Sequence, residues 1–169
     1  GIIRNHYVGR TFIEPTQQIR SLGVKLKHNV NKTLIKNKSL ILIDDSLVRG
    51  TTSVKIIKML YEAGAKEVHL RIASPPIQFP DYYGVDTPDQ DELLASKLDL
   101  EGMRKFINAK TLQFLSLEGL YKSMGYEKRN QSYPQFTDHC FTGEYPIKPI
   151  DANDKNLADE QLSFMSSKS

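Results

Sequence analysis

The sequence predicts an α/β domain with a doubly wound, mostly parallel sheet, and two observations indicate it. First, a short apolar run at residues 40–44 and an alternating segment at residues 68–73 enclose residues 52–63, where apolar side chains have helical spacing. A strand, a helix and a second strand in this order form a right-handed βαβ unit with parallel strands. Second, a third short strand is predicted at residues 111–115, after further helical segments, which continues the alternation of strands and helices.

The run at residues 40–44 reads LILID and is predicted to be the central strand. Continuous apolar residues are typical of a strand buried on both faces of a parallel sheet. Helical spacing of Val54, Ile57 and Leu60 defines the following helix, and Gly64 ends it. Residues 68–73 alternate apolar side chains with His69 and Arg71, so this strand is expected to have one more polar face.

The remaining elements are shorter. Helices are predicted over residues 89–96, 100–107 and 116–124, with Ser116 as the N-terminal cap of the last. Upstream, residues 1–20 are polar and aromatic without a period and are expected to form a mobile loop, with a short helix at 17–23. Residues 25–30 are a weak strand candidate, residues 29–39 a turn-rich connector, and residues 151–169 a polar tail expected to be disordered.

Composition excludes several classes of protein. Hydrophobic residues make up 39% and charged residues 25% of 169 residues, which is ordinary for a globular domain. A net charge of +3 without a dense basic stripe argues against nucleic-acid binding. We expect no membrane association, because no apolar stretch approaches the roughly 20 residues of a spanning helix. The single cysteine, Cys140, excludes an internal disulfide and fits a reducing cytoplasm.

The most informative stretch is residues 40–53, LILIDDSLVRGTTS. Asp44 and Asp45 fall at the carboxyl end of a predicted strand, where open α/β sheets bind ligands. The loop that follows leads into a helix whose unpaired N–H groups attract an anion. The two acids share a ligand only if the chain turns directly after the strand, because neighbouring side chains in a strand point to opposite faces. The alternative interpretation is that the two acids and the polar loop only cap the helix and bind no ligand.

This stretch resembles the phosphoribosyl-pyrophosphate (PRPP) loop of type I phosphoribosyltransferases, whose fold the chain is then expected to share, incomplete at its amino-terminal side. The resemblance implies that the acids hold ribose hydroxyls or one Mg²⁺ ion and that the loop holds the 5′-phosphate. The PRPP-binding residues implied are Asp44, Asp45, Ser46, Val48, Arg49, Gly50, Thr51, Thr52 and Ser53. The metal ligands implied are Asp44 and Asp45.

A second segment, residues 4–20, reads RNHYVGRTFIEPTQQIR and resembles the flexible loop of glutamine PRPP amidotransferases. In that family the loop closes over PRPP and lines a path for ammonia, so Arg4, Tyr7 and Arg10 are implied to act in catalysis. Arg4 stands where a lysine is usual and His6 where an arginine is usual. The resemblance covers about residues 1–150 and implies that the family's glutamine-hydrolysing domain precedes the region seen here.

The family resemblance carries further expectations. The enzyme transfers ammonia from glutamine to C1 of PRPP, giving 5-phosphoribosylamine in the first step of purine biosynthesis. Purine nucleotides are expected feedback inhibitors, and the protein is expected to be a cytoplasmic homo-oligomer. Some members carry an iron–sulfur cluster, but Pro134, Thr137 and Asp81 stand at three of the cysteine positions. Since a cluster normally needs four thiolates, and Cys140 is one, no cluster is expected.

Two other functions use the same PRPP loop. A phosphoribosyltransferase acting on a nucleobase fits the acids and loop, but the run from Tyr7 to Phe12 argues against it. A regulator that senses PRPP without turnover also fits and would not need an ammonia loop. An upstream amide-hydrolysing domain with an amino-terminal cysteine would distinguish the first function from both.

Overall fold

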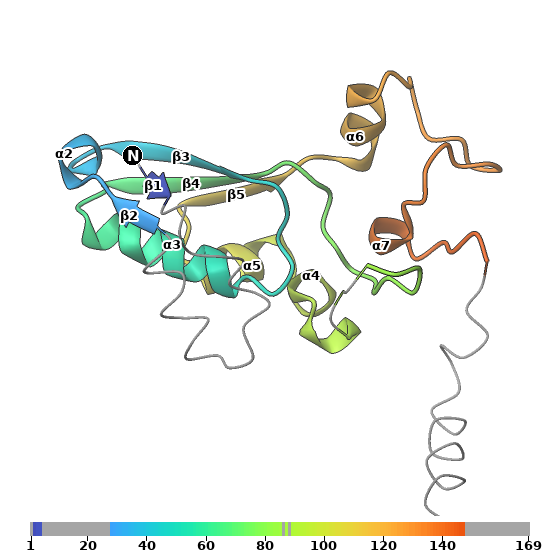
Figure 1. Cartoon of the computed structure of the whole chain (residues 1–169), viewed down its shortest axis with the longest axis horizontal. Helices are drawn as coiled ribbons and strands as arrows, with labels where there is room; N and C mark the ends of the chain where they lie inside the picture. Colours follow the sequence, from blue (N-terminus) through green and yellow to red (C-terminus); the bar gives the residue numbers. More distant parts are fainter. Residues whose placement is uncertain (1, 5–27, 86, 88, 148–169) are drawn as a thin grey trace, which may run out of the picture.

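The computed structural model describes residues 2–4, 28–85, 87 and 89–147. Its main feature is a three-stranded parallel sheet in the order β3 (Ser39–Asp44), β4 (Glu67–Ile72) and β5 (Thr111–Phe114), seen side by side in Figure 1. A separate antiparallel ribbon joins β1 (Ile2–Arg4) to β2 (His28–Val30). The predicted α/β fold with a parallel sheet is confirmed.

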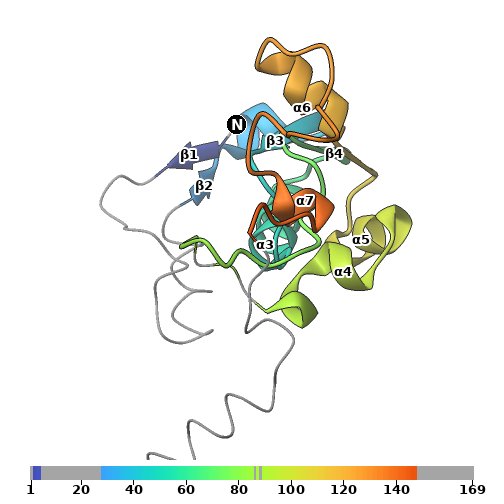
Figure 2. The same cartoon turned by 90° about the vertical axis from the view of Figure 1, so that its right-hand side faces the viewer.

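The predicted βαβ unit is present. Helix α3 (Thr51–Glu62) connects β3 to β4, and the two strands pair in parallel register from Ser39 opposite Glu67 to Asp44 opposite Ile72. Helix α5 (Leu100–Ile107) precedes β5 and ends at the residues expected from the sequence. In both views α3 and α5 lie on the same side of the sheet (Figure 1, Figure 2).

The core lies between this side of the sheet and the two helices. β4 turns alternate apolar residues inward, and they are among the most buried side chains of the described chain. Residues from every layer meet here: Val68, Leu70 and Ile72 of β4, Ile57 and Leu60 of α3, Ile107 of α5 and Leu112 of β5. Burying each such side chain contributes roughly 1.5–3 kcal/mol, so this interface fixes the sheet against the helices.

The prediction that residues 40–44 form a central strand buried on both faces is wrong for the described region. β4 lies between β3 and β5, and β3 is the edge strand of this sheet. Ile41 and Ile43 are 69% and 72% exposed, because both long helices of the described part cover the opposite face. The outward residues His69 and Arg71 of β4 are half-buried, as expected of the more polar face.

Two local predictions at the amino-terminal side are corrected. The connector at residues 29–39 contains a short helix, α2 (Lys32–Ile35), since Asn31 caps the N–H of Leu34 and Ile35 anchors it with 1% exposure. The expected loop at residues 1–20 contains β1, which pairs with residues 28–30. The rest of that loop, the helix expected at 17–23, residues 25–27 of the weak strand and the tail at 151–169 lie outside the described residues.

The shorter downstream elements follow the sequence more closely. The helix expected at residues 89–96 is a 3₁₀ turn, η2 (Gln90–Glu92), followed by α4 (Leu94–Lys97). Helix α6 (Leu117–Ser123) starts where Ser116 accepts a hydrogen bond from the Gly119 N–H, as predicted. Helix α7 (His139–Thr142) has no counterpart in the prediction, because four residues are too few to show a helical period.

Candidate functional site

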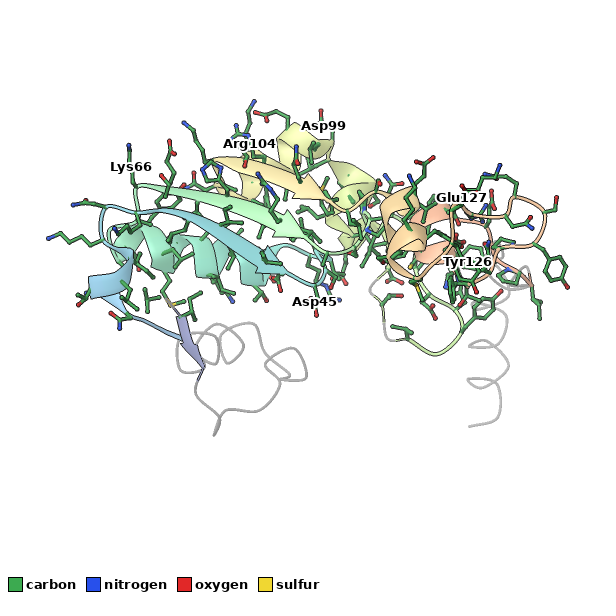
Figure 3. All side chains as sticks on the ribbon, turned by 90° about the horizontal axis from the view of Figure 1, so that it is seen from above. Asp45, Lys66, Asp99, Arg104, Tyr126 and Glu127 are labelled. Carbon is green, nitrogen blue, oxygen red and sulfur yellow. The ribbon has the colours of Figure 1, made fainter. Side chains whose placement is uncertain are left out.

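The loop between β3 and α3 stands at the carboxyl edge of the sheet, where Asp45 lies beyond the arrowhead of β3 (Figure 3). The Asp44 carbonyl accepts a hydrogen bond of 2.9 Å from the Ala73 N–H, which holds the end of β3 beside the end of β4. Leu47 is only 2% exposed and pins the loop to the core. The position is the one that open α/β sheets use for ligands.

The chain turns directly after the strand. Asp44 Oδ1 accepts a hydrogen bond of 3.1 Å from the Asp45 N–H. Asp45 Oδ1 in turn accepts from the Ser46 N–H at 2.6 Å and from the Ser46 hydroxyl at 3.2 Å. Asp44 is half-buried and Asp45 is exposed. The chain thus bends at Asp45, directly after the last residue of β3.

Helix α3 begins with groups suited to an anion. Gly50 is its N-terminal cap, in the left-handed region with φ +74°, and brings no side chain to cap the helix. The N–H groups of the first turn have no partner within the helix, and no acidic residue lies in that turn. Thr51 and Thr52 are exposed, whereas Ser53 is 3% exposed. This helix end favours negative charge.

The other side of the loop rests on α4 and α5. The Val48 carbonyl accepts a hydrogen bond of 2.8 Å from the Leu94 N–H. A Cβ atom at Gly50 would lie 2.9 Å from Leu94 Cδ2 and 3.2 Å from Phe106 Cε1. The positive φ thus favours glycine at this position, and a Cβ would in addition displace the ends of the Leu94 and Phe106 side chains.

Arg49 points to the same neighbouring segment. Its Nη2 and Nε donate to Glu92 Oε2 at 2.6 Å and 3.2 Å, and both side chains are about half exposed. Sequence reasoning found Arg49 but missed Glu92. The partner lies 43 residues downstream in a short polar turn, and nothing in the local pattern connects the two.

The structure brings the predicted PRPP-loop residues together at one end of the sheet. These are the strand-end acids and the loop and helix residues Asp44, Asp45, Ser46, Val48, Arg49, Gly50, Thr51, Thr52 and Ser53. The backbone of Arg4 lies in β1 of the separate ribbon. Tyr7 and Arg10 lie outside the described residues.

A second polar cluster is centred on Asp81 and His139, and His139 precedes Cys140 in α7. Asp81 Oδ2 lies 2.6 Å from His139 Nε2, and Asp81 Oδ1 accepts the N–H groups of Tyr83 and Val85. Burial raises the pKa of Asp81, but these hydrogen bonds outweigh burial and hold the pKa below its usual range. Burial raises the pKa of the Cys140 thiol. Within the described part of the chain, no group of three or more His, Cys, Asp or Glu is placed to hold a metal ion.

The helices of the described residues are short. Crossing the hydrocarbon layer takes roughly 20 mostly apolar residues. No helix in the described ranges is both long enough and apolar enough to do so.

Comparison with known proteins identifies similar sequences. No protein-family model matches the chain. The chain is 60% identical over 168 residues to an amidophosphoribosyltransferase of Rhizobium etli. The aligned region covers 99% of this chain and 34% of that protein. It is 51% identical to the chloroplastic amidophosphoribosyltransferase 1 of Arabidopsis thaliana, over 92% of this chain and 26% of that protein. The chain spans about a third of the length of the curated relatives that it matches.

Solved structures agree with the sequence comparison. A glutamine PRPP amidotransferase from Bacillus subtilis, complexed with ADP and GMP, matches with a TM-score of 0.72 and 48% sequence identity. The match covers 88% of this chain and 32% of that one. The resemblance to amidophosphoribosyltransferases that the sequence predicts is confirmed.

Proposed function

We propose that this chain forms the PRPP-binding part of the transferase site of an amidophosphoribosyltransferase. One observation carries the proposal. The two acids and the helix-opening loop of residues 44–53 are gathered at the carboxyl edge of a parallel sheet, in a chain 60% identical to a relative of that name. In this proposal residues 1–150 belong to the transferase domain, residues 151–169 are a tail, and a glutamine-hydrolysing domain acts together with them.

The loop would bind the 5′-phosphate of PRPP. The phosphate accepts hydrogen bonds from backbone N–H groups of residues 48–53 and from the exposed hydroxyls of Thr51 and Thr52. Gly50 lets the backbone approach the anion closely, because it has no Cβ and takes a positive φ. The hydroxyl of Ser46 lies at the start of the loop, next to Asp45.

The two acids would face the ribose. Asp44 and Asp45 offer carboxylate oxygens to the ribose hydroxyls, and the same oxygens fit Mg²⁺, which prefers carboxylate and phosphate oxygens. A pair of carboxylates suffices, since Mg²⁺ keeps several waters and binds through one or two carboxylates together with substrate phosphates. When bound, the ion supplies charge neutralisation for the pyrophosphate.

The proposed reaction has two stages. Glutamine and water give glutamate and ammonia at the glutamine-hydrolysing domain. Ammonia then attacks C1 of PRPP and the bond from C1 to the pyrophosphate oxygen breaks. Pyrophosphate leaves, and the new C1 nitrogen loses one proton to water to give 5-phosphoribosylamine. Positive charge develops on the ribose, so the carboxylates of Asp44 and Asp45 stabilise it, and the loop fixes the distant phosphate. Arg4, Tyr7 and Arg10 are proposed to exclude water and contain ammonia.

Further parts of the proposal concern regulation and context. Purine nucleotides are proposed as feedback inhibitors, which the relative complexed with ADP and GMP supports. The protein is proposed to act as a homo-oligomer in the cytoplasm, although the matched plant relatives are chloroplastic.

The proposal is tested with the full-length protein, Mg²⁺ and PRPP. Either glutamine or ammonium chloride serves as the nitrogen donor, and pyrophosphate release and 5-phosphoribosylamine are measured. We expect both donors to support synthesis, with pyrophosphate and aminosugar formed in equal amounts. A protein that binds PRPP but releases no pyrophosphate with either donor would be a PRPP sensor, and the proposed reaction would be rejected.

A further inference from the structure

We propose that Glu92 is a positioning residue that withholds the positive charge of Arg49 from the ligand phosphate and so limits the affinity of the loop. This inference rests on the proposed function, because it takes the loop of residues 44–53 as the phosphate site. It concerns a residue outside that loop, on the turn that follows the long connection from β4.

The pair is well formed. Two nitrogens of the Arg49 guanidinium, Nη2 and Nε, donate to the same oxygen of Glu92, at 2.6 Å and 3.2 Å. Charge-assisted hydrogen bonds of this kind orient a guanidinium strongly. The positive charge of Arg49 is therefore directed at the 90–97 segment and is neutralised there.

Glu92 itself is held in place by its turn. Its N–H donates to the Asp89 carbonyl at 2.8 Å, which closes the turn. The Ser96 hydroxyl donates to the carbonyls of Gln90 and Leu93 on either side of Glu92. Leu93, the next residue, is completely buried. The Glu92 carboxylate thus projects from a backbone that its own turn holds in place.

The ion pair is not what shapes the loop. The loop is already fixed by the buried side chain of Leu47, by the hydrogen bond from the Leu94 N–H to the Val48 carbonyl, and by the tight packing of Gly50. The pair is about half exposed, and such pairs contribute little to stability. Its main consequence is therefore electrostatic rather than structural.

Removing the charge of Glu92 would leave Arg49 as an uncompensated cation within the phosphate loop. Arg49 lies between Val48 and Gly50, so its side chain starts among the backbone groups proposed to hold the phosphate. A released guanidinium is a strong bidentate partner for phosphate. Binding would tighten, and products that keep the 5′-phosphate would leave more slowly.

The test measures binding to the full-length protein by calorimetric titration with Mg²⁺·PRPP and with ribose 5-phosphate, which keeps the 5′-phosphate but lacks the pyrophosphate. Glu92→Gln is expected to tighten both by about three- to tenfold, the range for one partly screened charge near an anion. In steady-state assays the KM for PRPP is expected to fall while kcat does not rise.

Two variants decide whether Arg49 mediates the effect. Adding Arg49→Ala to Glu92→Gln is expected to abolish the gain. Asp91→Asn is the matched control, because it removes the same charge from the adjacent exposed residue and is expected to change affinity less than twofold.

The inference is overturned if Glu92→Gln weakens binding or leaves it unchanged, if the gain persists without Arg49, or if Asp91→Asn gives the same gain. Failure of the proposed function has a different signature. In that case the unaltered protein itself would not bind Mg²⁺·PRPP, whatever residue stands at position 92.

Discussion

Gly50 shows how much chemistry rests on a single residue at the loop. Its φ of +74° belongs to the region that side chains avoid, at a cost of roughly 1–2 kcal/mol for other residues. A Cβ there would also meet Leu94 Cδ2 at 2.9 Å, closer than carbon atoms normally approach. Both effects act on the loop that carries the proposed phosphate site.

Replacing Gly50 by alanine is therefore expected to loosen the start of α3. The Val54 N–H donates to the Gly50 carbonyl at 3.0 Å, and its hydrogen exchange is expected to speed up by about tenfold or more. Gly125→Ala is the control, because φ at Gly125 is +89° but nothing lies within 4 Å of the added Cβ. Equal local effects of the two substitutions would show that backbone strain alone matters and that the contact with Leu94 does not.

The residues that sequence reasoning finds are those whose chemistry is local. Asp44, Asp45 and Gly50 stand within seven positions of one another, so their order along the chain already predicts a strand end, a turn and a helix start. Glu92 and Leu94 touch the same loop from far along the chain. Their role depends on how α4 packs, and no periodicity encodes that contact.

At the scale of elements, a buried ion pair holds the region after α6. Arg129 donates through Nε and Nη2 to the two oxygens of Asp138, and both residues are less than a tenth exposed. Tyr121 of α6 donates its hydroxyl to the same carboxylate at 2.9 Å, and Glu144 accepts from Arg129 on the exposed side. These contacts join α6, the following loop and α7.

Asp138→Ala is expected to loosen α7, since it leaves the buried Arg129 charge with only exposed partners. Breaking a buried ion pair costs about 3 kcal/mol or more. The N–H groups of Phe141 and Thr142 donate to the Asp138 carbonyl and report on α7. Their hydrogen exchange is therefore expected to speed up about a hundredfold. Glu144→Gln, at the exposed partner of the same arginine, is expected to change exchange less than fivefold. The reverse order of the two effects would contradict this interpretation.

The pH dependence of α7 stability gives an independent check on the Arg129–Asp138 ion pair. Burial raises the pKa of Asp138, but hydrogen bonds from Arg129 and Tyr121 outweigh it and place the pKa below its ordinary value. A carboxylate with a lowered folded pKa stabilises the fold above the unfolded value, about 3.9, and loses this contribution as the pH falls through the folded pKa. Protection of α7, corrected for intrinsic exchange, should fall as the pH drops below about 4.

The longer helices and strands with a clear apolar period were predicted from the sequence, whereas several of the short elements were not. Helices α3 and α5 and strands β4 and β5 follow clear apolar patterns, and the structure places them within one or two residues of expectation. Helix α2 was missed because lysines and asparagines surround its single buried residue, Ile35. The strand β1 was missed because its pairing with β2 spans more than twenty residues of sequence.

At the scale of the whole molecule, the sheet has one covered and one open face in the described region. Helices α3 and α5 cover one face (Figure 1). Ile41 and Ile43 of β3 are mostly exposed. Residues 40–43 are apolar at every position, which is typical of a strand buried on both faces. This pattern is why the sequence predicted a central strand.

The central claim is that Asp44 and Asp45 together with the following loop bind PRPP, and one titration tests it most directly. Full-length protein carrying Asp44→Asn and Asp45→Asn is compared with unaltered protein for binding of Mg²⁺·PRPP. Asp89→Asn with Asp91→Asn serves as a control that removes two charges nearby. We predict that affinity falls about tenfold or more in the first variant only, with glutamine hydrolysis retained. Unchanged PRPP affinity in the first variant would contradict the claim.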